Sequence, residues 1–407
     1  MIGAGRTLPR PAGGRGTVGG RGTVGGRGTV GGRRATLAAV CAATLVAAAG
    51  CGGLSGAVDA EGAAGAGAGA GAGGPTTLGA VGPACPGGAA AGAVGTTAIA
   101  ATGPRPSGPL LVDPDSQPAR ELARLRTGTA TATATASELA AADAAATIAE
   151  QPLAFPVGTW LPDPRAAVAA RMAAAAQHGA TAIFMVYALP HLDAGAGFSA
   201  GGAANADAYR AFTAQVAAGI GAGRAIVVLE PDALGQIDTL DAPAQAERYQ
   251  LLNEAVDAYG RLGATSVYLD GANCGWTPAP AIADRLRRAG VARARGFALN
   301  VSNFYPTADE VARGDLISAL TGGAHFVVDT SRNGRGPAGG GLANPWCNPP
   351  GRGLGRTPTT DTGDPRADAF LWVKTPGASD GDCGRGNPPA GTWWPAQARE
   401  LVGDRAS

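Results

Sequence analysis

The stretch that decides the fold is IVVLEPDAL, residues 226–234. Ile226–Leu229 are four apolar residues, three of them β-branched, which predicts a strand buried on both faces. Pro231 ends this strand and biases Glu230 toward an extended backbone. Asp232 is therefore expected where a parallel strand opens into a loop, the edge at which α/β proteins concentrate their chemistry. A carboxyl group beside a dry strand end can act as a general acid, because burial raises its pKa.

Acidic residues after strands are also common as helix caps and ion-pair partners, so this motif alone does not establish a catalytic site. The arrangement is repeated along the chain, however. Asp193, Asp270 and Asp380 each come after an apolar stretch. The carboxyl ends of parallel strands meet at one edge of a sheet, so these carboxylates are expected to lie near one another.

The aromatic residues divide the chain into two parts. Residues 1–105 are rich in Gly, Ala and Arg, and the first aromatic residue is Phe155. The N-terminal part buries too little apolar surface to offset its ordering entropy, so we expect one α/β domain over residues 106–407. The formal net charge of +1 gives no sign of a nucleic-acid partner. A monomer is expected.

Residues 1–51 are predicted to be a basic arm followed by an export signal. The hexamer GGRGTV repeats in the arm, and Arg33–Arg34 precede an apolar run, Ala35–Ala49. This run is too short to span a bilayer, and its basic flank is typical of a secretory signal. The run ends in AAGC, so Cys51 either carries the lipid of a membrane-anchored lipoprotein or is incidental to ordinary cleavage and secretion. Residues 52–105 then form a flexible tether.

From residue 138 onward, helix-like and strand-like stretches alternate. Alternation of this kind predicts a parallel sheet, and the strand count and length fit a distorted, incomplete βα barrel. The expected helices are Glu138–Ala149, Arg165–His178, Asp207–Ile220, Pro243–Leu262, Pro280–Ala289 and Ala308–Leu320, and the expected strands are Ala182–Tyr187, Ile226–Leu229, Ser266–Leu269, Gly296–Asn300, Ala324–Asp329 and Ala369–Lys374.

Tryptophans in the predicted loops indicate a sugar site. The apolar face of a pyranose stacks on an indole ring, and its hydroxyls bind nearby carboxylates and amides. Trp160, Trp276 and Trp346 are flanked by loop-forming residues and are expected to line a groove. Asn303 and Arg332, in loops after two other strands, are expected to contact the same ligand.

Trp372 and the cysteines of the predicted domain are candidates for structural roles. Trp372 lies within a predicted strand and is expected in the core. Cys274, Cys347 and Cys383 lie in the domain, and their positions do not fix a pairing. No Cys/His cluster has metal-ligand spacing, so neither a metal nor a cofactor is expected.

Seven segments together resemble glycoside hydrolase family six, the cellulases that include endoglucanases and cellobiohydrolases. They occur in the family's order across the predicted domain, and no single segment would suffice. The segments are YALPHLDAGAGFSAGG (187–202), VVLEPDAL (227–234), YLDGANCGW (268–276), NVSNF (300–304), DTSRNG (329–334), WCNPPGR (346–352) and LWVKTPGASDG (371–381).

The resemblance implies a distorted βα barrel that hydrolyses β-1,4-glucan with inversion. Inversion needs one protonated carboxyl group and one carboxylate acting through water, about 6.5–9.5 Å apart. The resemblance matches Asp232 to the general acid, Asp193 to the residue that governs its protonation, and Asp380 to the candidate base. Whether Asp380 acts directly, or a water chain leads toward Asp193, stays open. The other implied roles are Tyr187 beneath the distorted sugar, Asp270 beside the cleavage site, Ser199 holding the attacking water, Trp160, Trp276 and Trp346 as sugar platforms, Lys374 as a donor to substrate, and Cys347 with Cys383 as a disulfide.

The chain also departs from the family. Ala194 stands where the family usually has Cys after the aspartate matched by Asp193, and Ile237–Leu240 contains no partner cysteine. Cys274 is expected to be a free thiol. The further differences are Phe198 for Tyr, Asn273 for His, and Ala378 for a Glu that normally contacts sugar near the base.

Three alternatives remain beside an endoglucanase. The connection Asn333–Trp346 is short and Gly-rich, whereas exo-acting members have long loops that roof a tunnel, so an open cleft and internal cleavage are expected. A cellobiohydrolase is the second enzyme reading. A tethered glucan-binding protein with weakened catalysis is suggested by Ala194 and Ala378. An unrelated α/β barrel would have its aspartates pointing apart.

Overall fold

The computed structural model describes residue 85 and residues 103–129, 134–192 and 201–405. The predicted export signal, Cys51, Asp193, Ser199 and Phe198 lie outside these residues. Within the described part of the chain, no helix has the length and apolar character needed to cross a membrane.

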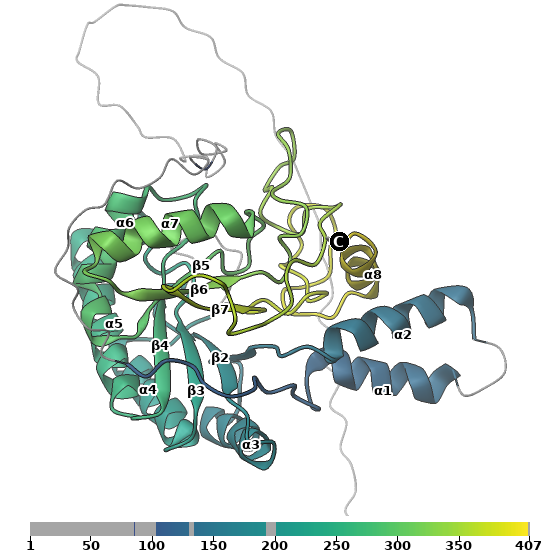
Figure 1. The fold of residues 1–407 in the computed structure, drawn as a ribbon, viewed down its shortest axis with the longest axis horizontal. Coiled ribbons are helices and arrows are strands. Elements are labelled where there is room, and N and C mark those ends of the chain that lie inside the picture. Colours follow the sequence, from purple (N-terminus) through teal and green to yellow (C-terminus); the bar gives the residue numbers. More distant parts are fainter. Residues whose placement is uncertain (1–84, 86–102, 130–133, 193–200, 406–407) are drawn as a thin grey trace, which may run out of the picture. The chain divides into compact units, whose positions relative to one another are not determined.

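Seven parallel strands form one curled sheet whose spatial order follows the chain (Figure 1). The two edge strands do not pair with each other in the described residues, so the barrel is incomplete, as predicted. A hydrogen bond from the Ala154 N–H to the Trp372 carbonyl (3.0 Å) links the residue before the first strand to the residue after the last. The strands are β1 (Phe155–Gly158), β2 (Ala182–Tyr187), β3 (Ala225–Leu229), β4 (Thr265–Asp270), β5 (Gly296–Leu299), β6 (His325–Asp329) and β7 (Ala367–Leu371).

Helices follow most of the strands and cover the outside of the sheet (Figure 1). Several begin at a side-chain cap: Asp163, Asn205 and Asp241 each accept a hydrogen bond from the backbone three residues on. The connection between β6 and β7 contains no helix. The helices are α1 (Gln117–Thr129), α2 (Ala136–Ala149), α3 (Pro164–Gln177), α4 (Ala206–Ile220), α5 (Ala242–Gly260), α6 (Ala279–Arg288), α7 (Thr307–Leu320) and α8 (Pro395–Gly403), with short 3₁₀ turns at Ile237–Thr239 and Val291–Arg293.

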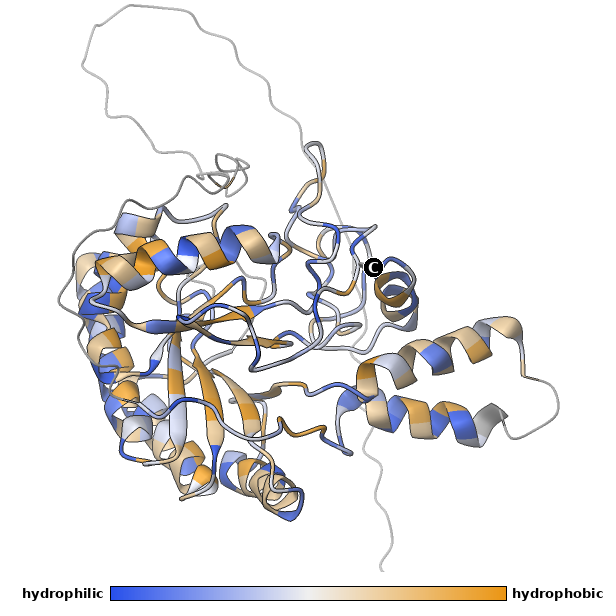
Figure 2. Cartoon of the chain, viewed as in Figure 1, coloured by the Kyte–Doolittle hydropathy of each residue, from blue (hydrophilic) through white to orange (hydrophobic). Residues whose placement is uncertain are grey.

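The sheet is buried on both faces, and β3 shows why its sequence is uniformly apolar. Val227 and Leu229 pack in the layer between sheet and helices, whereas Ile226 and Val228 pack inside the curl of the sheet. Alternate residues of a strand point to opposite faces, so a strand covered on both sides needs apolar residues throughout. Figure 2 shows the strands as predominantly apolar segments.

Three elements were not predicted. Strand β1 is only four residues long and contains Pro156, which weakens its strand signal. Helices α1 and α8 also lacked a clear prediction. Helix α2 packs against both of them, and Ile148, Leu401 and Trp372 share one apolar cluster there. The prediction that Trp372 belongs to the core is thus confirmed, since its side chain is 1% exposed.

The Trp372 cluster should dominate the stability of this end of the domain. We expect Trp372→Ala to lower the free energy of unfolding by about 4 kcal/mol, because it opens a large cavity and removes the hydrogen bond from the indole N–H to the Arg356 carbonyl. Trp160→Ala is the matched control, since Trp160 is 53% exposed, and should change stability little. Urea denaturation of both variants measures the difference. Equal losses would contradict the assignment.

Candidate active site

Strained backbone marks the carboxyl ends of three neighbouring strands. Glu230 and Asp232 after β3, Ala272 after β4, and Asn300 and Ser302 after β5 all have φ between 53° and 70°. Residues other than glycine rarely adopt this left-handed region, and such strain concentrates at functional sites. The extended backbone predicted for Glu230 is therefore wrong.

The side chain of Glu230 binds the backbone of the loop after β2. It is buried, and its carboxylate accepts the N–H groups of Ala188 (3.0 and 3.1 Å) and Leu189 (3.1 Å), which binds the loop after β2 to β3. Burial raises the pKa of Glu230 to about 7, against the opposing effect of these hydrogen bonds and of the Arg248 charge.

Arg248 links the same two loops a second time. Its guanidinium donates to the carbonyls of His191 (2.6 Å) and Ala233 (3.1 Å). Where the family's usual cysteine pair is missing, hydrogen bonds from a buried arginine thus connect the loop after β2 to the loop after β3. Sequence reasoning missed Arg248, because it lies in the middle of α5, far from any motif.

Asp232 and Asp270 are brought together, as predicted. The Asp232 N–H donates to Asp270 Oδ2 (3.1 Å), and the Ala272 N–H donates to the same oxygen (3.1 Å). Asp270 is buried, whereas Asp232 is half-buried. Burial and the nearby charge of Asp232 raise the pKa of Asp270 well above its usual range. Two carboxyl groups in this arrangement resist losing both protons.

The indole rings of Trp160 and Trp276 lie against glycines at the same edge of the sheet. A Cβ added to Gly158 would come within 2.1 Å of the Trp160 ring, and one added to Gly235 within 2.7 Å of the Trp276 ring. Only glycine permits these close approaches. Gly158, at the end of β1, pairs in register with Tyr187 at the end of β2. Tyr187 therefore lies beside the strand that precedes Trp160.

Asp329, at the end of β6, gathers the loops that follow three strands. Its buried carboxylate accepts backbone N–H groups from Ser302 (2.9 Å), Ser331 (2.9 Å), Val373 (3.2 Å) and Lys374 (3.0 Å). Burial raises the pKa of Asp329 and the hydrogen bonds oppose that rise. The sequence identified Asp329 only as the end of a strand.

Asp380 lies in a strongly cationic environment. Arg332 Nη1 (2.7 Å) and the Asn348 N–H (2.9 Å) both donate to Asp380 Oδ2, and Lys374 Nζ contacts Asp380 Oδ1 (2.8 Å). Burial disfavours the charged form, but the two cations and their hydrogen bonds outweigh it and lower the pKa of Asp380. The arrangement therefore favours the ionised form of Asp380.

The prediction that Arg332 contacts substrate does not fit the structure. Its guanidinium is fully buried, and Nη2 donates to the Ser302 carbonyl (2.6 Å) and hydroxyl (3.0 Å). Arg332 therefore positions Asp380. Lys374 keeps some exposure beside Asp380, while Asn303 and Trp346 are half-buried. Asn333 and Ala378, in neighbouring loops, are buried.

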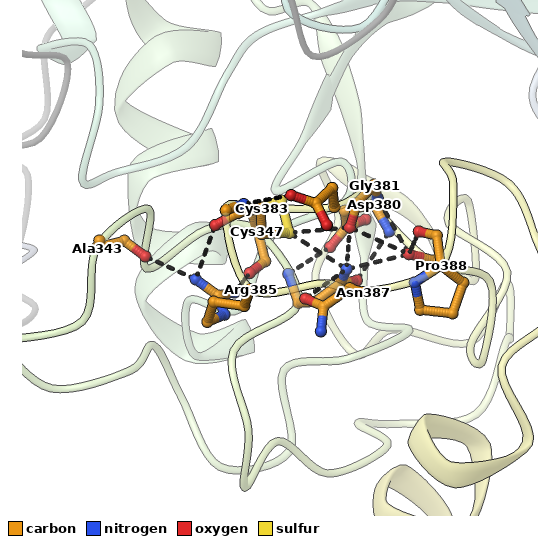
Figure 3. Close-up of a disulfide and its surroundings, with 12 residues drawn as sticks. Ala343, Cys347, Asp380, Gly381, Cys383, Arg385, Asn387 and Pro388 are labelled. Atoms are coloured by element: carbon orange, nitrogen blue, oxygen red, sulfur yellow. Dashed lines mark hydrogen bonds between the residues drawn. A yellow bond between two sulfur atoms is a disulfide. The ribbon is translucent and has the colours of Figure 1, made fainter.

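The predicted disulfide between Cys347 and Cys383 is confirmed, and Figure 3 shows Asp380 and Gly381 beside it. Asn348, next to Cys347, accepts the Asp380 N–H (2.8 Å) and donates to the Gly381 carbonyl (2.8 Å). The disulfide and Asn348 together hold the loop that carries Asp380.

The prediction of a free thiol at Cys274 is wrong. Cys274 forms a disulfide with Cys85, which lies in the segment predicted to be a tether. The two cysteines are 189 residues apart, so no local spacing could reveal the pair. The bond attaches Cys85 to the loop that carries Trp276. No group of His, Cys, Asp or Glu side chains suited to a metal occurs among the residues described.

The described residues thus form a parallel half-barrel with paired carboxyl groups and indole rings along one strand edge. Residues 118–405 match the family described as Glycosyl hydrolases family 6, and the chain belongs to that family.

Relatives with named activities support the assignment. Endoglucanase A of Thermobispora bispora is 43% identical over 240 residues, which are 56% of this chain and 51% of that protein. Endoglucanase 1 of Streptomyces halstedii is 39% identical over 264 residues, 63% of this chain and 80% of that protein. The chain spans about half the length of the first of these relatives. An endoglucanase structure from Mycobacterium tuberculosis, in complex with a thio-linked cellobioside, is 40% identical, with a TM-score of 0.67 over 73% of this chain and 97% of that one.

Replacement of Asp329 should loosen three loops at once. In Asp329→Asn one oxygen becomes an NH₂ group that faces backbone N–H donors, so we expect a loss of about 3 kcal/mol in the free energy of unfolding. Asp361→Asn, an exposed site, is the matched control. Chemical denaturation measures both; a neutral Asp329→Asn variant would contradict this role.

Glu230 should make stability depend on pH. A carboxyl group whose folded pKa is about 7, against a usual 4.5, stabilises the fold fully below pH 4.5 and loses that effect as pH rises through 7. We expect the melting temperature to fall from pH 5 to pH 8, and Glu230→Gln to flatten the fall. Glu150→Gln, an exposed site, should leave the slope unchanged. A slope untouched by Glu230→Gln would sink this assignment.

Proposed function

We propose that this chain hydrolyses internal β-1,4-glucosidic bonds of cellulose or related glucans with inversion, and that Asp232 is the general acid. The observation that carries this proposal is the contrast between two carboxyl sites at one sheet edge. Asp232 adjoins the buried Asp270, whose pKa is raised, while Asp380 is held ionised by two cations. Inversion needs one carboxyl group that keeps its proton and one that does not, and opposite environments supply that difference.

The proposed roles follow from these environments. The Asp232 carboxyl group protonates the glycosidic oxygen as the bond to the anomeric carbon breaks, and water attacks that carbon from the opposite face. Asp380, with its pKa lowered, is a weak proton acceptor. We therefore favour the water chain toward Asp193 over direct proton removal by Asp380.

Substrate binding is assigned to the aromatic side chains. The Trp160 ring, largely exposed, and the half-buried Trp276 and Trp346 offer faces for pyranose rings. In strand order Tyr187, at the end of β2, lies between Trp160, which follows β1, and Asp232, which follows β3. No cofactor is invoked for this reaction.

Internal cleavage is favoured by relatives and by loop length. The endoglucanases named above are about 40% identical, whereas a probable 1,4-β-D-glucan cellobiohydrolase of Aspergillus fumigatus is 34% identical over 301 residues. The connection Asn333–Trp346 is short for a loop that roofs a tunnel. We also propose export, because the two disulfides suit an oxidising compartment; a lipid anchor at Cys51 extends that proposal.

Carboxymethylcellulose tests the reaction and its mode together. We expect the chain to lower viscosity steeply for few reducing ends released, and Asp232→Asn to lose activity by about 100-fold or more while it still binds glucan. Asp361→Asn should behave as the unmodified chain. Release of cellobiose with little loss of viscosity would instead identify a cellobiohydrolase. Binding without release would identify a glucan-binding protein, and full activity of Asp232→Asn would refute the acid assignment.

A further inference from the structure

The Trp276 indole is carried by one tight turn in the loop that follows β4. The Trp276 N–H donates to the Asn273 carbonyl (3.2 Å), and the Gly275 N–H donates to Asn273 Oδ1 (3.1 Å). Asn273 is buried, and a side-chain hydrogen bond of this kind, from an Asn to the backbone two residues on, closes a turn. Because Cys274 and Trp276 belong to the same turn, a contact that fixes Cys274 also fixes the backbone of Trp276.

Two glycines allow aromatic rings to pack closely on this turn. A Cβ added to Gly275 would overlap the Tyr305 ring, and one added to Gly235 would come within 2.7 Å of the Trp276 ring. Gly235 lies in the loop that carries Asp232. The indole therefore packs on the loop of the proposed acid, and the turn that carries it packs on Tyr305, just before α7.

Helix α7 also holds the turn by a hydrogen bond. Glu310 Oε1 accepts the Cys274 N–H (2.8 Å), and Arg313, three residues on and on the same helix face, donates from Nη2 to the Gly271 carbonyl (3.5 Å). Glu310 is fully buried, and its Oε2 has no hydrogen-bond partner among the described residues. A buried carboxylate with an unpaired oxygen is costly, so packing alone would be better served by an apolar residue. What the carboxylate supplies is the acceptor for the Cys274 N–H.

A disulfide holds the same residue through its side chain. Cys274 is bonded to Cys85, which is half-buried. Further along the chain, the Pro104 carbonyl accepts the hydroxyl of Ser266, a residue of β4 (2.7 Å). The chain before α1 is thus attached to β4 itself and, through Cys85, to the loop that follows β4. Glu310 holds the backbone of Cys274, and Cys85 holds its side chain.

We propose that Glu310 is a positioning residue that fixes the Trp276 indole for stacking on a sugar ring, and that the Cys85–Cys274 disulfide is a second hold on the same turn. This inference rests on the proposed function, in which Trp276 is a platform for glucan. A platform that is fixed before the ligand arrives loses little conformational freedom on binding, so affinity rises. Glu310 and Cys85 act through Trp276, so they affect substrate binding and leave the chemical step unchanged.

The kinetics of cellohexaose hydrolysis test this proposal. We expect Trp276→Ala to raise KM about tenfold through loss of stacking, and Glu310→Ala to raise KM about threefold with kcat unchanged. Glu310→Gln, the matched control, should keep the KM of the unmodified chain, because its amide oxygen accepts the Cys274 N–H. An unchanged KM for Glu310→Ala, a fall in kcat in place of the rise in KM, or a raised KM for Glu310→Gln would overturn the proposal.

A double-mutant cycle separates positioning of the indole from a general loosening of the domain. If Glu310 acts through Trp276, Glu310→Ala adds nothing to the KM of Trp276→Ala. A further rise of about threefold in the double variant would show independent effects and would overturn the proposal. An unchanged KM for Trp276→Ala itself would remove the platform, and this proposal with it.

Cys85→Ser covers the case in which Glu310→Ala does not fold. It should raise KM when Trp276 is present and leave KM unchanged in the Trp276→Ala background; any other result would then overturn the proposal. Failure of the proposed function is recognised separately, because the unmodified chain would not hydrolyse cellohexaose. Calorimetric binding of cellohexaose then replaces KM in the same cycle, and absence of binding would overturn this proposal as well.

Discussion

The buried Asp329 carboxylate is the interaction on which the site depends. Through four backbone N–H groups it fixes the loops after β5, β6 and β7. The same loops supply the environment of Asp380, because Lys374 contacts it directly and Ser302 holds Arg332 against it. Asp329 fixes the backbone of these loops, and Asp380 contacts the Arg332 and Lys374 side chains that the loops carry. An acceptor-only group with two oxygens suits the first task, since converging N–H donors at strand ends otherwise lack partners.

The electrostatic environment changes across the strand edge. Next to β3 and β4, the half-buried Asp232 adjoins the buried Asp270. Next to β6 and β7, Asp380 is neutralised by Arg332 and Lys374. The pKa of Asp270 is thus raised on one side of the edge, and the pKa of Asp380 is lowered on the other. In a parallel sheet, the loop after each strand lies at the same edge. The residues around each loop then set the local dielectric and charge of its carboxyl group.

Several parts of the fold were predictable because their signals are local. Strands β2 and β3 were located within a residue of their true ends, since they are buried on both faces and consist of β-branched and apolar residues. Strand β1 was missed because four residues with a proline carry almost no pattern. The Cys85–Cys274 disulfide and the contacts of Arg248 escaped prediction for a related reason: their partners are far away in the chain and leave no spacing to read.

The sequence by itself determined the alternation of strands and helices, the family through its seven ordered motifs, and the meeting of Asp232 with Asp270. These follow from burial patterns and motifs that lie within short windows of chain. Only the tertiary structure decided where each charge lies: Arg332 is buried beside Asp380, and Glu230 is buried and binds the loop after β2. Burial and distance set the free energy of a charge, and both are properties of the folded chain.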